Sequence, residues 1–255
     1  MIRVIASDLD GTLLNEQHLL SERTIRAVKK TQEAGIRFIV ATGRNFKQAI
    51  HAMGESGILC DYIVNSGAEI RNSKHEILQS GSMNIQDCKA VYDILKKYDL
   101  MYLFVSENTD YCIGSTKDRE QELIQHILTF EQGMTEAEAR ETSLFKSMLS
   151  KTEVVSSFEE LVDSGKSITK IFAASDDLAM LKEIEMQLRE NSNLAVASSF
   201  ANNLEVTDIN AQKGIVLKNY IESLGYTMNE VMVFGDSMND RTKRGYPVGS
   251  MSFSL

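Results

Sequence analysis

The 255-residue sequence is poor in cysteine, proline and tryptophan, with three cysteines, one proline and no tryptophan. The cysteines, Cys60, Cys88 and Cys112, are odd in number, lie far apart and form no Cys-x-x-Cys pair. Disulfide frameworks and structural zinc sites need paired or clustered cysteines, so neither is expected. We expect three reduced thiols that take no part in chemistry.

The sequence also lacks an excess of positive charge and long apolar runs. It contains 27 Lys and Arg against 36 Asp and Glu, a net charge of −9, which argues against a nucleic-acid partner. No stretch approaches the roughly 18 apolar residues of a membrane span. Arg3 and Asp8 interrupt the segment where a signal peptide would be apolar. We therefore expect a cytoplasmic protein with no membrane partner.

Short apolar runs are present, and they predict the fold class. Residues 3–7, 37–41, 62–65 and 231–234 are rich in Val, Ile and Phe without strict alternation, which is typical of strands buried on both faces. Helical patterns lie between them, and Ser21 and Asn45 are suitable N-cap residues. Alternating strands and helices predict an α/β fold with a doubly wound parallel, Rossmann-like sheet.

The third and fourth predicted strands are separated by far more chain than one crossover needs. We therefore assign residues 1–80 and 209–255 to one domain and residues 81–208 to an inserted domain. The insert combines helices with strands in hairpin arrangements, which predicts an α+β domain with an antiparallel sheet. A Ser-, Glu- and Thr-rich stretch near 131–157 is expected to be irregular.

Asp8 and Asp10 follow the first predicted strand. Side chains two residues apart in an extended chain point to the same side, here at the carboxyl edge of the sheet, where open α/β folds bind ligands. Two carboxylates this close either share a proton or need a cation. An acidic turn without chemistry is the alternative, because Asp-Gly is a common turn dipeptide.

Three further loops carry polar residues at the same edge of the predicted sheet. Thr42 and Gly43 open a helix, where a hydroxyl and backbone N–H groups suit an anion, although plain capping is the alternative. Lys213 lies in the first turn of a helix expected at 215–224, which is unfavourable for a cation unless an anion is near. The loop after the fourth strand contributes Asp236, Asn239 and Asp240.

Four motifs occur in order: Asp8-Leu-Asp-Gly-Thr, Ala-Thr42-Gly-Arg, Lys213-Gly and Gly-Asp236-Ser-Met-Asn-Asp240. In this the chain resembles haloacid dehalogenase superfamily phosphatases of the Cof type, which carry a large type-2 cap domain between the third strand and the motif lysine. The resemblance implies a Mg²⁺-dependent phosphatase that hydrolyses a small phosphorylated metabolite, such as a sugar phosphate, through an aspartyl-phosphate. It also implies that the insert is the cap.

The same resemblance implies a role for each motif residue. Asp8 would be the nucleophile, and Asp10 would be the general acid and base. Thr42, Gly43 and Lys213 would bind the phosphoryl group. Asp8, the backbone oxygen of Asp10, and Asp236 would hold Mg²⁺, while Asn239 and Asp240 would orient the metal ligands or Lys213.

The sequence departs from the family pattern in two places. Asn65-Ser66-Gly67-Ala68 stands where the family has Asn-Gly-Ala, which places a hydroxyl near the expected site. The tail 241–255 lacks helical apolar spacing and contains the only proline, Pro247. It resembles an abbreviated or frame-shifted end, and we expect lower stability or dimerisation through the exposed edge of the fourth strand.

Two other functions remain open at this stage. The first is a truncated, catalytically impaired family member that binds a ligand or partner without turnover. This hypothesis depends on the tail alone. A phosphomutase or phosphotransferase is the second, which the absence of another phosphate-binding motif disfavours. The expected partner is a small phosphate ester, and the chain is expected to be a monomer or a homodimer.

Overall fold

The computed structural model describes residues 1–15, 17–107, 109–131, 133–198 and 200–235, and the structural statements below concern these residues. The chain divides into two compact units. The first contains Met1–Gly81 and Asn210–Leu255, and the second is Ser82–Ile209. The predicted tail features at 241–255 lie outside the described residues.

The first unit contains a six-stranded sheet with the order β12-β1-β2-β3-β4-β5. The strands β12, β1, β2 and β3 are parallel, whereas β4 and β5 are antiparallel to their neighbours. The strand bounds are β1 Val4–Ser7, β2 Arg37–Ala41, β3 Asp61–Val64, β4 Glu69–Arg71, β5 Ile77–Ser80 and β12 Val231–Phe234. The four predicted strands therefore form the parallel part, and the α/β fold class is confirmed.

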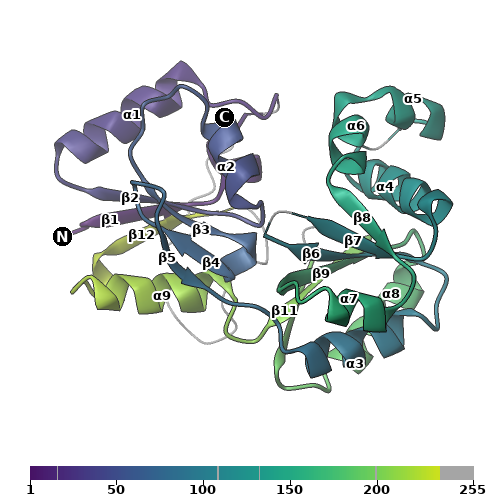
Figure 1. Cartoon of the computed structure of the whole chain (residues 1–255). Helices are drawn as coiled ribbons and strands as arrows, with labels where there is room; N and C mark the ends of the chain where they lie inside the picture. Colours follow the sequence, from purple (N-terminus) through teal and green to yellow (C-terminus); the bar gives the residue numbers. More distant parts are fainter. Residues whose placement is uncertain (16, 108, 132, 199, 236–255) are drawn as a thin grey trace. The chain divides into compact units, whose positions relative to one another are not determined.

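Helices cover both faces of this sheet (Figure 1). The helices α1 (Glu22–Glu33) and α2 (Phe46–Met53) lie on one face, and α9 (Lys213–Ser223) lies on the other. Successive strand residues alternate between the two cores. Ile5 and Val40 belong to the cluster under α1 and α2, whereas Ala6 and Ile39 belong to the cluster under α9. Burial on both faces explains why these strands read as continuous apolar runs.

The predicted cap residues begin their helices. The Oγ of Ser21 accepts a hydrogen bond from the Thr24 N–H at 3.0 Å, and Oδ1 of Asn45 accepts one from the Gln48 N–H at 2.9 Å. Both satisfy a backbone donor that the first turn leaves without a partner. The helix α9 begins at Lys213, two residues before the expected start.

The second unit contains a six-stranded sheet with the order β10-β11-β9-β6-β7-β8. It is antiparallel except for the β7–β8 pair. The bounds are α3 Ile85–Leu95, β6 Met101–Ser106, β7 Asp110–Ile113, α4 Thr116–Phe130, α5 Glu136–Glu141, α6 Ser143–Leu149, β8 Thr152–Val155, α7 Phe158–Asp163, β9 Ile168–Ala174, α8 Leu178–Leu188, β10 Leu194–Ala197 and β11 Asn203–Asp208. One core lies under α3, α7 and α8, and a second lies under α4 and its neighbours (Figure 1).

The expectation of an irregular segment near 131–157 is wrong. This stretch forms α5, α6 and β8. Thr135 and Thr142 cap the two helices with side-chain hydrogen bonds, and Ala139 and Phe145 are buried in the core beneath α4. The polar composition reflects helices that bury only a narrow face.

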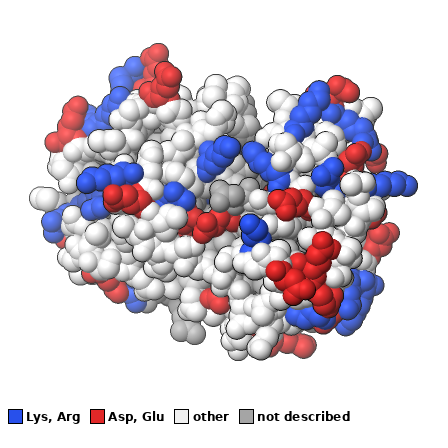
Figure 2. Space-filling model, viewed as in Figure 1, with Lys and Arg blue, Asp and Glu red and all other residues white. Residues whose placement is uncertain are grey.

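The remaining composition-based expectations concern surface charge and cysteine. Among the described residues, no helix is long and apolar enough to cross a membrane. On the face drawn in Figure 2, Lys and Arg are interspersed with Asp and Glu. Cys60, Cys88 and Cys112 are free and buried. Burial raises the pKa of each thiol to about 12, so all three stay protonated at neutral pH.

Candidate active site

Asp8 and Asp10 lie where β1 ends, but their surroundings differ. The N–H of Asp8 donates to the carbonyl oxygen of Phe234 in β12 at 3.0 Å, which continues the sheet pairing by one residue. The side chain of Asp8 is 9% exposed and that of Asp10 is 42% exposed. Asp10 and Gly11 belong to a short helical turn, Leu9–Leu13, in which Gly11 adopts a φ of 68°, a conformation that favours glycine. One carboxylate is therefore buried in the sheet edge, and the other reaches solvent.

Lys213 is the partner of the buried carboxylate. Its Nζ donates to Oδ1 of Asp8 at 3.0 Å, and both side chains are less than a tenth exposed. Lys213 is the first residue of α9, and its N-cap residue, Gln212, makes no side-chain capping bond. The carboxylate of Asp8 supplies the anion that favours a lysine at this end of a helix.

The loop after β3 lies against the start of α9. A Cβ at Gly67 would be 3.0 Å from the carbonyl carbon of Gln212 and 3.1 Å from the backbone nitrogen of Lys213. Its φ of +108° is also a conformation that other residues rarely adopt. Glycine at this position lets the loop approach closely enough to fix where α9 begins, and hence where the Lys213 side chain originates.

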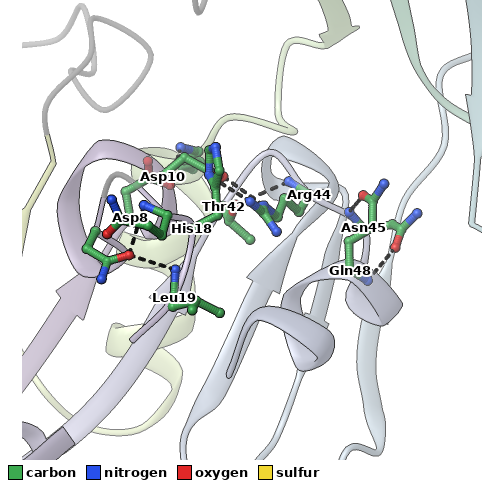
Figure 3. A network of polar contacts seen from close by, with 11 residues as sticks. Asp8, Asp10, His18, Leu19, Thr42, Arg44, Asn45 and Gln48 are labelled. Atoms are coloured by element: carbon green, nitrogen blue, oxygen red, sulfur yellow. Dashed lines mark hydrogen bonds and ion pairs between the residues drawn. The ribbon is translucent and has the colours of Figure 1, made fainter. Parts of the chain in front are cut away.

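The loop after β2 is anchored to the loop after β3 through backbone hydrogen bonds. Thr42 is 1% exposed. Its N–H donates to the Ile63 carbonyl at 2.9 Å, and its own carbonyl accepts from the Ser66 N–H at 3.2 Å. The Thr42 Oγ1 accepts from the Arg44 N–H at 3.2 Å. Thr42 thus lies at the carboxyl edge of the same sheet as Asp8 (Figure 3), and Gly43 follows it in the loop after β2.

Arg44, for which no role was predicted from the sequence, contacts Asp10. Its Nε donates to Oδ2 of Asp10 at 2.8 Å, and its second guanidinium nitrogen donates to Oδ1 at 2.6 Å (Figure 3). The Nδ1 of His18 lies 3.5 Å from Oδ1 of the same carboxylate. The sequence feature that could have indicated this contact is the position of Arg44 just after β2, since β2 pairs with β1. No sequence feature indicated the position of His18.

Asn65 is a second residue of interest in the loop after β3. It is 2% exposed, and its Nδ2 has no hydrogen-bond partner among the described residues. Asn65 and Ser66 adopt φ values of 51° and 59°, which non-glycine residues rarely do. A buried donor without a partner costs free energy, so the loop holds this amide in place at some expense of stability.

The predicted metal ligands are only partly within the described residues. Asp236, Asn239 and Asp240 lie outside them. Among the residues described, no three His, Cys, Asp or Glu side chains come together as a metal-binding group. The Asp8 carboxylate and the Asp10 backbone carbonyl are hard oxygen donors of the type that Mg²⁺ prefers, so the donor types fit this ion.

Comparisons with known proteins identify the family of the chain. The model of the haloacid dehalogenase-like hydrolase family matches residues 5–242. The phosphatase YcsE of Bacillus subtilis, which acts on 5-amino-6-(5-phospho-D-ribitylamino)uracil, is 24% identical over 94% of this chain and 78% of its own. An HMP-PP phosphatase of Klebsiella pneumoniae is 28% identical over 96% and 81%. A haloacid dehalogenase-like hydrolase structure from B. subtilis superposes with a TM-score of 0.78 at 22% identity, covering 94% and 85%.

Proposed function

The chain belongs to the haloacid dehalogenase-like hydrolase family and is a phosphoric monoester hydrolase, and we propose that it acts through Asp8 on a small phosphorylated metabolite with the help of Mg²⁺. The observation that carries the proposal is the buried pair of Asp8 and Lys213, with Nζ and Oδ1 3.0 Å apart at the carboxyl end of β1. A carboxylate held beside a lysine at a helix N-terminus is suited to meet a phosphate dianion.

Asp8 is the proposed nucleophile. The attack forms a bond between its carboxylate oxygen and phosphorus while the ester oxygen leaves, which gives an aspartyl-phosphate. The support is its ionic partner: the positive charge of Lys213 favours the ionised, nucleophilic form. Water then attacks the same phosphorus and releases phosphate.

Asp10 is the proposed general acid and base. It gives a proton to the leaving ester oxygen in the first half-reaction and takes one from the attacking water in the second. Its partial exposure supports the role, because a carboxyl group that reaches solvent can exchange protons with water between the half-reactions.

Thr42, Gly43 and Lys213 are the proposed phosphoryl-binding residues. The support is their position, since the loop after β2 and the start of α9 both lie at the carboxyl edge of the sheet that carries Asp8. A hydroxyl, backbone N–H groups and a lysine are complementary to phosphoryl oxygens.

Asp8, the backbone oxygen of Asp10, and Asp236 are the proposed Mg²⁺ ligands, with Asn239 and Asp240 orienting them. When bound, the ion would neutralise charge on the phosphoryl group and so lower its repulsion from the carboxylate. The residues of the protein still perform binding, positioning and proton transfer.

The relatives support the proposed class of substrate. YcsE and the HMP-PP phosphatase both act on phosphorylated small molecules, so we propose a metabolite of similar size, such as a sugar phosphate. The unit Ser82–Ile209 is the proposed cap, which would exclude water from the reacting groups. A cytoplasmic location and a monomeric or dimeric state complete the proposal.

The decisive experiment is hydrolysis of a panel of phosphomonoesters with Mg²⁺, with a chelator, and by Asp8→Asn. We expect Mg²⁺-dependent release of phosphate by the wild type and a fall of at least about 10³-fold in Asp8→Asn. Circular dichroism checks that the variant is folded. Robust turnover by folded Asp8→Asn would contradict the assignment of the nucleophile, and absence of turnover in the wild type would favour a ligand-binding protein.

A further inference from the structure

The geometry of Arg44 assigns it a function that goes beyond the roles proposed above. Its guanidinium donates to both carboxylate oxygens of Asp10, at 2.8 Å and 2.6 Å. A bidentate pair fixes the plane of a carboxylate as well as its distance, because the two parallel N–H groups match the two oxygens. The orientation of the Asp10 carboxylate is therefore set by a residue from a different loop (Figure 3).

The backbone of Arg44 is itself held at both ends of the residue. Its N–H donates to the Thr42 Oγ1 at 3.2 Å, and its carbonyl accepts from the Asn65 N–H at 2.8 Å. The side chain is 26% exposed, so most of it is packed against the protein. Arg44 thus connects the loops after β2 and β3 to the Asp10 carboxylate after β1 through hydrogen bonds.

Asp10 needs such support because little else restrains it. Its side chain is 42% exposed, and the turn that carries it continues into Gly11 at a φ of 68°. Among the described residues, Arg44 and His18 are the side chains whose polar atoms approach its carboxylate, and the His18 Nδ1 is 3.5 Å away. An exposed carboxylate without a bidentate partner samples several rotamers, whereas proton transfer requires one orientation.

We propose that Arg44 is a positioning residue, which holds the Asp10 carboxyl group in the orientation that delivers a proton to the leaving oxygen of the substrate. This inference rests on the proposed acid and base role of Asp10. In the first half-reaction the bond from phosphorus to the ester oxygen breaks, and the proton of Asp10 passes to that oxygen to give an alcohol. While Asp10 carries its proton, Arg44 keeps one hydrogen bond to the other oxygen, and the bidentate contact forms as the proton passes to the leaving oxygen.

A guanidinium beside a phosphate-binding loop has an obvious alternative role, which is direct contact with the phosphoryl group. The two roles differ in their dependence on the leaving group. Loss of proton delivery slows the hydrolysis of alkyl phosphates, because their leaving alkoxides are strongly basic. It has little effect on p-nitrophenyl phosphate, whose leaving group needs no proton. Loss of a phosphoryl contact harms both substrates equally, because their phosphate groups are the same.

The test measures kcat/KM, which reports steps up to the release of the alcohol, for an alkyl phosphate and for p-nitrophenyl phosphate. Arg44→Met is expected to lower the alkyl value by roughly 10²-fold and the aryl value by less than about fivefold. The alkyl phosphate kcat/KM of Arg44→Lys is expected to lie between those of Arg44→Met and the wild type, because an ammonium cannot bond both oxygens in one plane. In an Asp10→Asn background, Arg44→Met is expected to cause almost no further loss.

Arg37→Met is the matched control. Arg37 also pairs with a carboxylate of the first unit, since its Nε lies 2.5 Å from Oδ2 of Asp61, but Asp61 is at the start of β3, away from the catalytic loops. Its loss is expected to leave the ratio of the two kcat/KM values unchanged, so that destabilisation alone cannot imitate the result.

Two outcomes overturn the proposal, and they are distinguishable. In the first, Asp10→Asn lowers kcat/KM mainly for the alkyl phosphate, whereas Arg44→Met lowers kcat/KM equally for both substrates and lowers it further in the Asp10→Asn background. Arg44 then binds the phosphoryl group and does not position Asp10. If Asp10→Asn itself shows no leaving-group selectivity, the acid and base role of Asp10 fails and the proposal for Arg44 fails with it.

Discussion

Lys213 lies 205 residues after Asp8 in the sequence, yet its Nζ donates to Oδ1 of Asp8 at 3.0 Å. The pair joins the beginning of the chain to the helix that follows the inserted unit. Both side chains are buried, so removing either residue takes a close opposite charge away from a buried ion, which costs free energy. The same contact therefore links the proposed chemistry to the stability of the first unit.

Replacing Lys213 by Met is expected to lower both the stability of the first unit and the phosphatase activity. The free energy of unfolding should fall by about 3 kcal/mol, because the carboxylate of Asp8 loses its contact with the Lys213 ammonium in a buried position. The value of kcat/KM should fall by at least about 10²-fold, because a cation is lost from the phosphoryl site. Urea unfolding and steady-state kinetics measure the two effects.

Lys218 offers a control on the same helix. Its Nζ is 3.9 Å from Glu222, and its side chain is 32% exposed. Lys218→Met is expected to change stability by less than about 0.5 kcal/mol and to leave kcat/KM unchanged. A comparable loss of activity in both variants would show that the effect at position 213 is not specific to the site.

Gly67→Ala is expected to lower activity by displacing the start of α9. The added Cβ would meet the backbone of Gln212 and Lys213 at about 3 Å, which the two segments relieve only by moving apart. Gly35→Ala is the matched control, since Gly35 also has a positive φ, +78°, but an added Cβ there meets nothing within 4 Å. Gly35→Ala should cost about 1 kcal/mol with kcat/KM unchanged, and Gly67→Ala should cost more and reduce kcat/KM. Equal activity in the two variants would contradict the proposed role of the close approach.

Glu122 in α4 is expected to make the second unit less stable at alkaline pH. Burial raises the pKa of its carboxyl group to about 8 from an ordinary 4.5, and its Oε2 has no hydrogen-bond partner among the described residues. Between these values the folded state binds more protons than the unfolded state, so stability falls as the pH rises.

Two other titratable groups of the second unit, His126 and Asp110, determine the pH range in which this effect can be seen. Burial lowers the pKa of His126 to about 4 from 6.5, so stability rises with pH between these values. Burial raises the pKa of Asp110 to about 6 from 3.8, so stability falls with pH between these values. Above about pH 7 the titration of both groups is largely complete, and Glu122 dominates. Urea unfolding between about pH 7 and 8 should show a decline below about 1.4 kcal/mol per pH unit. Glu122→Gln should flatten it, and an unchanged slope would refute the assignment.

Removal of divalent cations is expected to stop turnover reversibly. A chelator should abolish phosphate release, and excess Mg²⁺ should restore it. Binding should also raise the melting temperature, since Mg²⁺ at 100 times its Kd stabilises the folded state by about 2.7 kcal/mol. The shift should be smaller in Asp8→Asn, which lacks one proposed ligand charge. A full shift in that variant would argue against Asp8 as a ligand.

The parallel strands were predictable from sequence because burial on both faces leaves a clear apolar signal in β1 to β3. The edge strand β12 has a similar apolar run, although its residues are only partly buried or exposed. The antiparallel strands β4 and β5 were not predicted. The strand β4 has three residues, and all four residues of β5 are exposed, so neither produces an apolar pattern. Their pairing depends on the tertiary arrangement rather than on local preference.

The candidate site was predictable to a similar extent. Asp8, Thr42 and Lys213 lie at the sheet edge where their loops indicated. The bidentate contact of Arg44 with Asp10 was missed, because sequence gives the loop in which an arginine lies but not the rotamer that its side chain adopts. Gly67 was visible in the sequence, but its necessity depends on a close approach between segments far apart in the chain.

The inserted unit brings its own two ends together. The N–H of Met83 donates to the carbonyl of Ile168, the first residue of β9, at 2.7 Å. The strand β11 runs antiparallel to β9, so its last residues return to the same end. For the first unit, a folded insert therefore acts as a short connection, and the entropy cost of closing the chain between β5 and α9 falls by on the order of 3 kcal/mol. We expect the insert to fold early and to accelerate the assembly of Asp8 and Lys213.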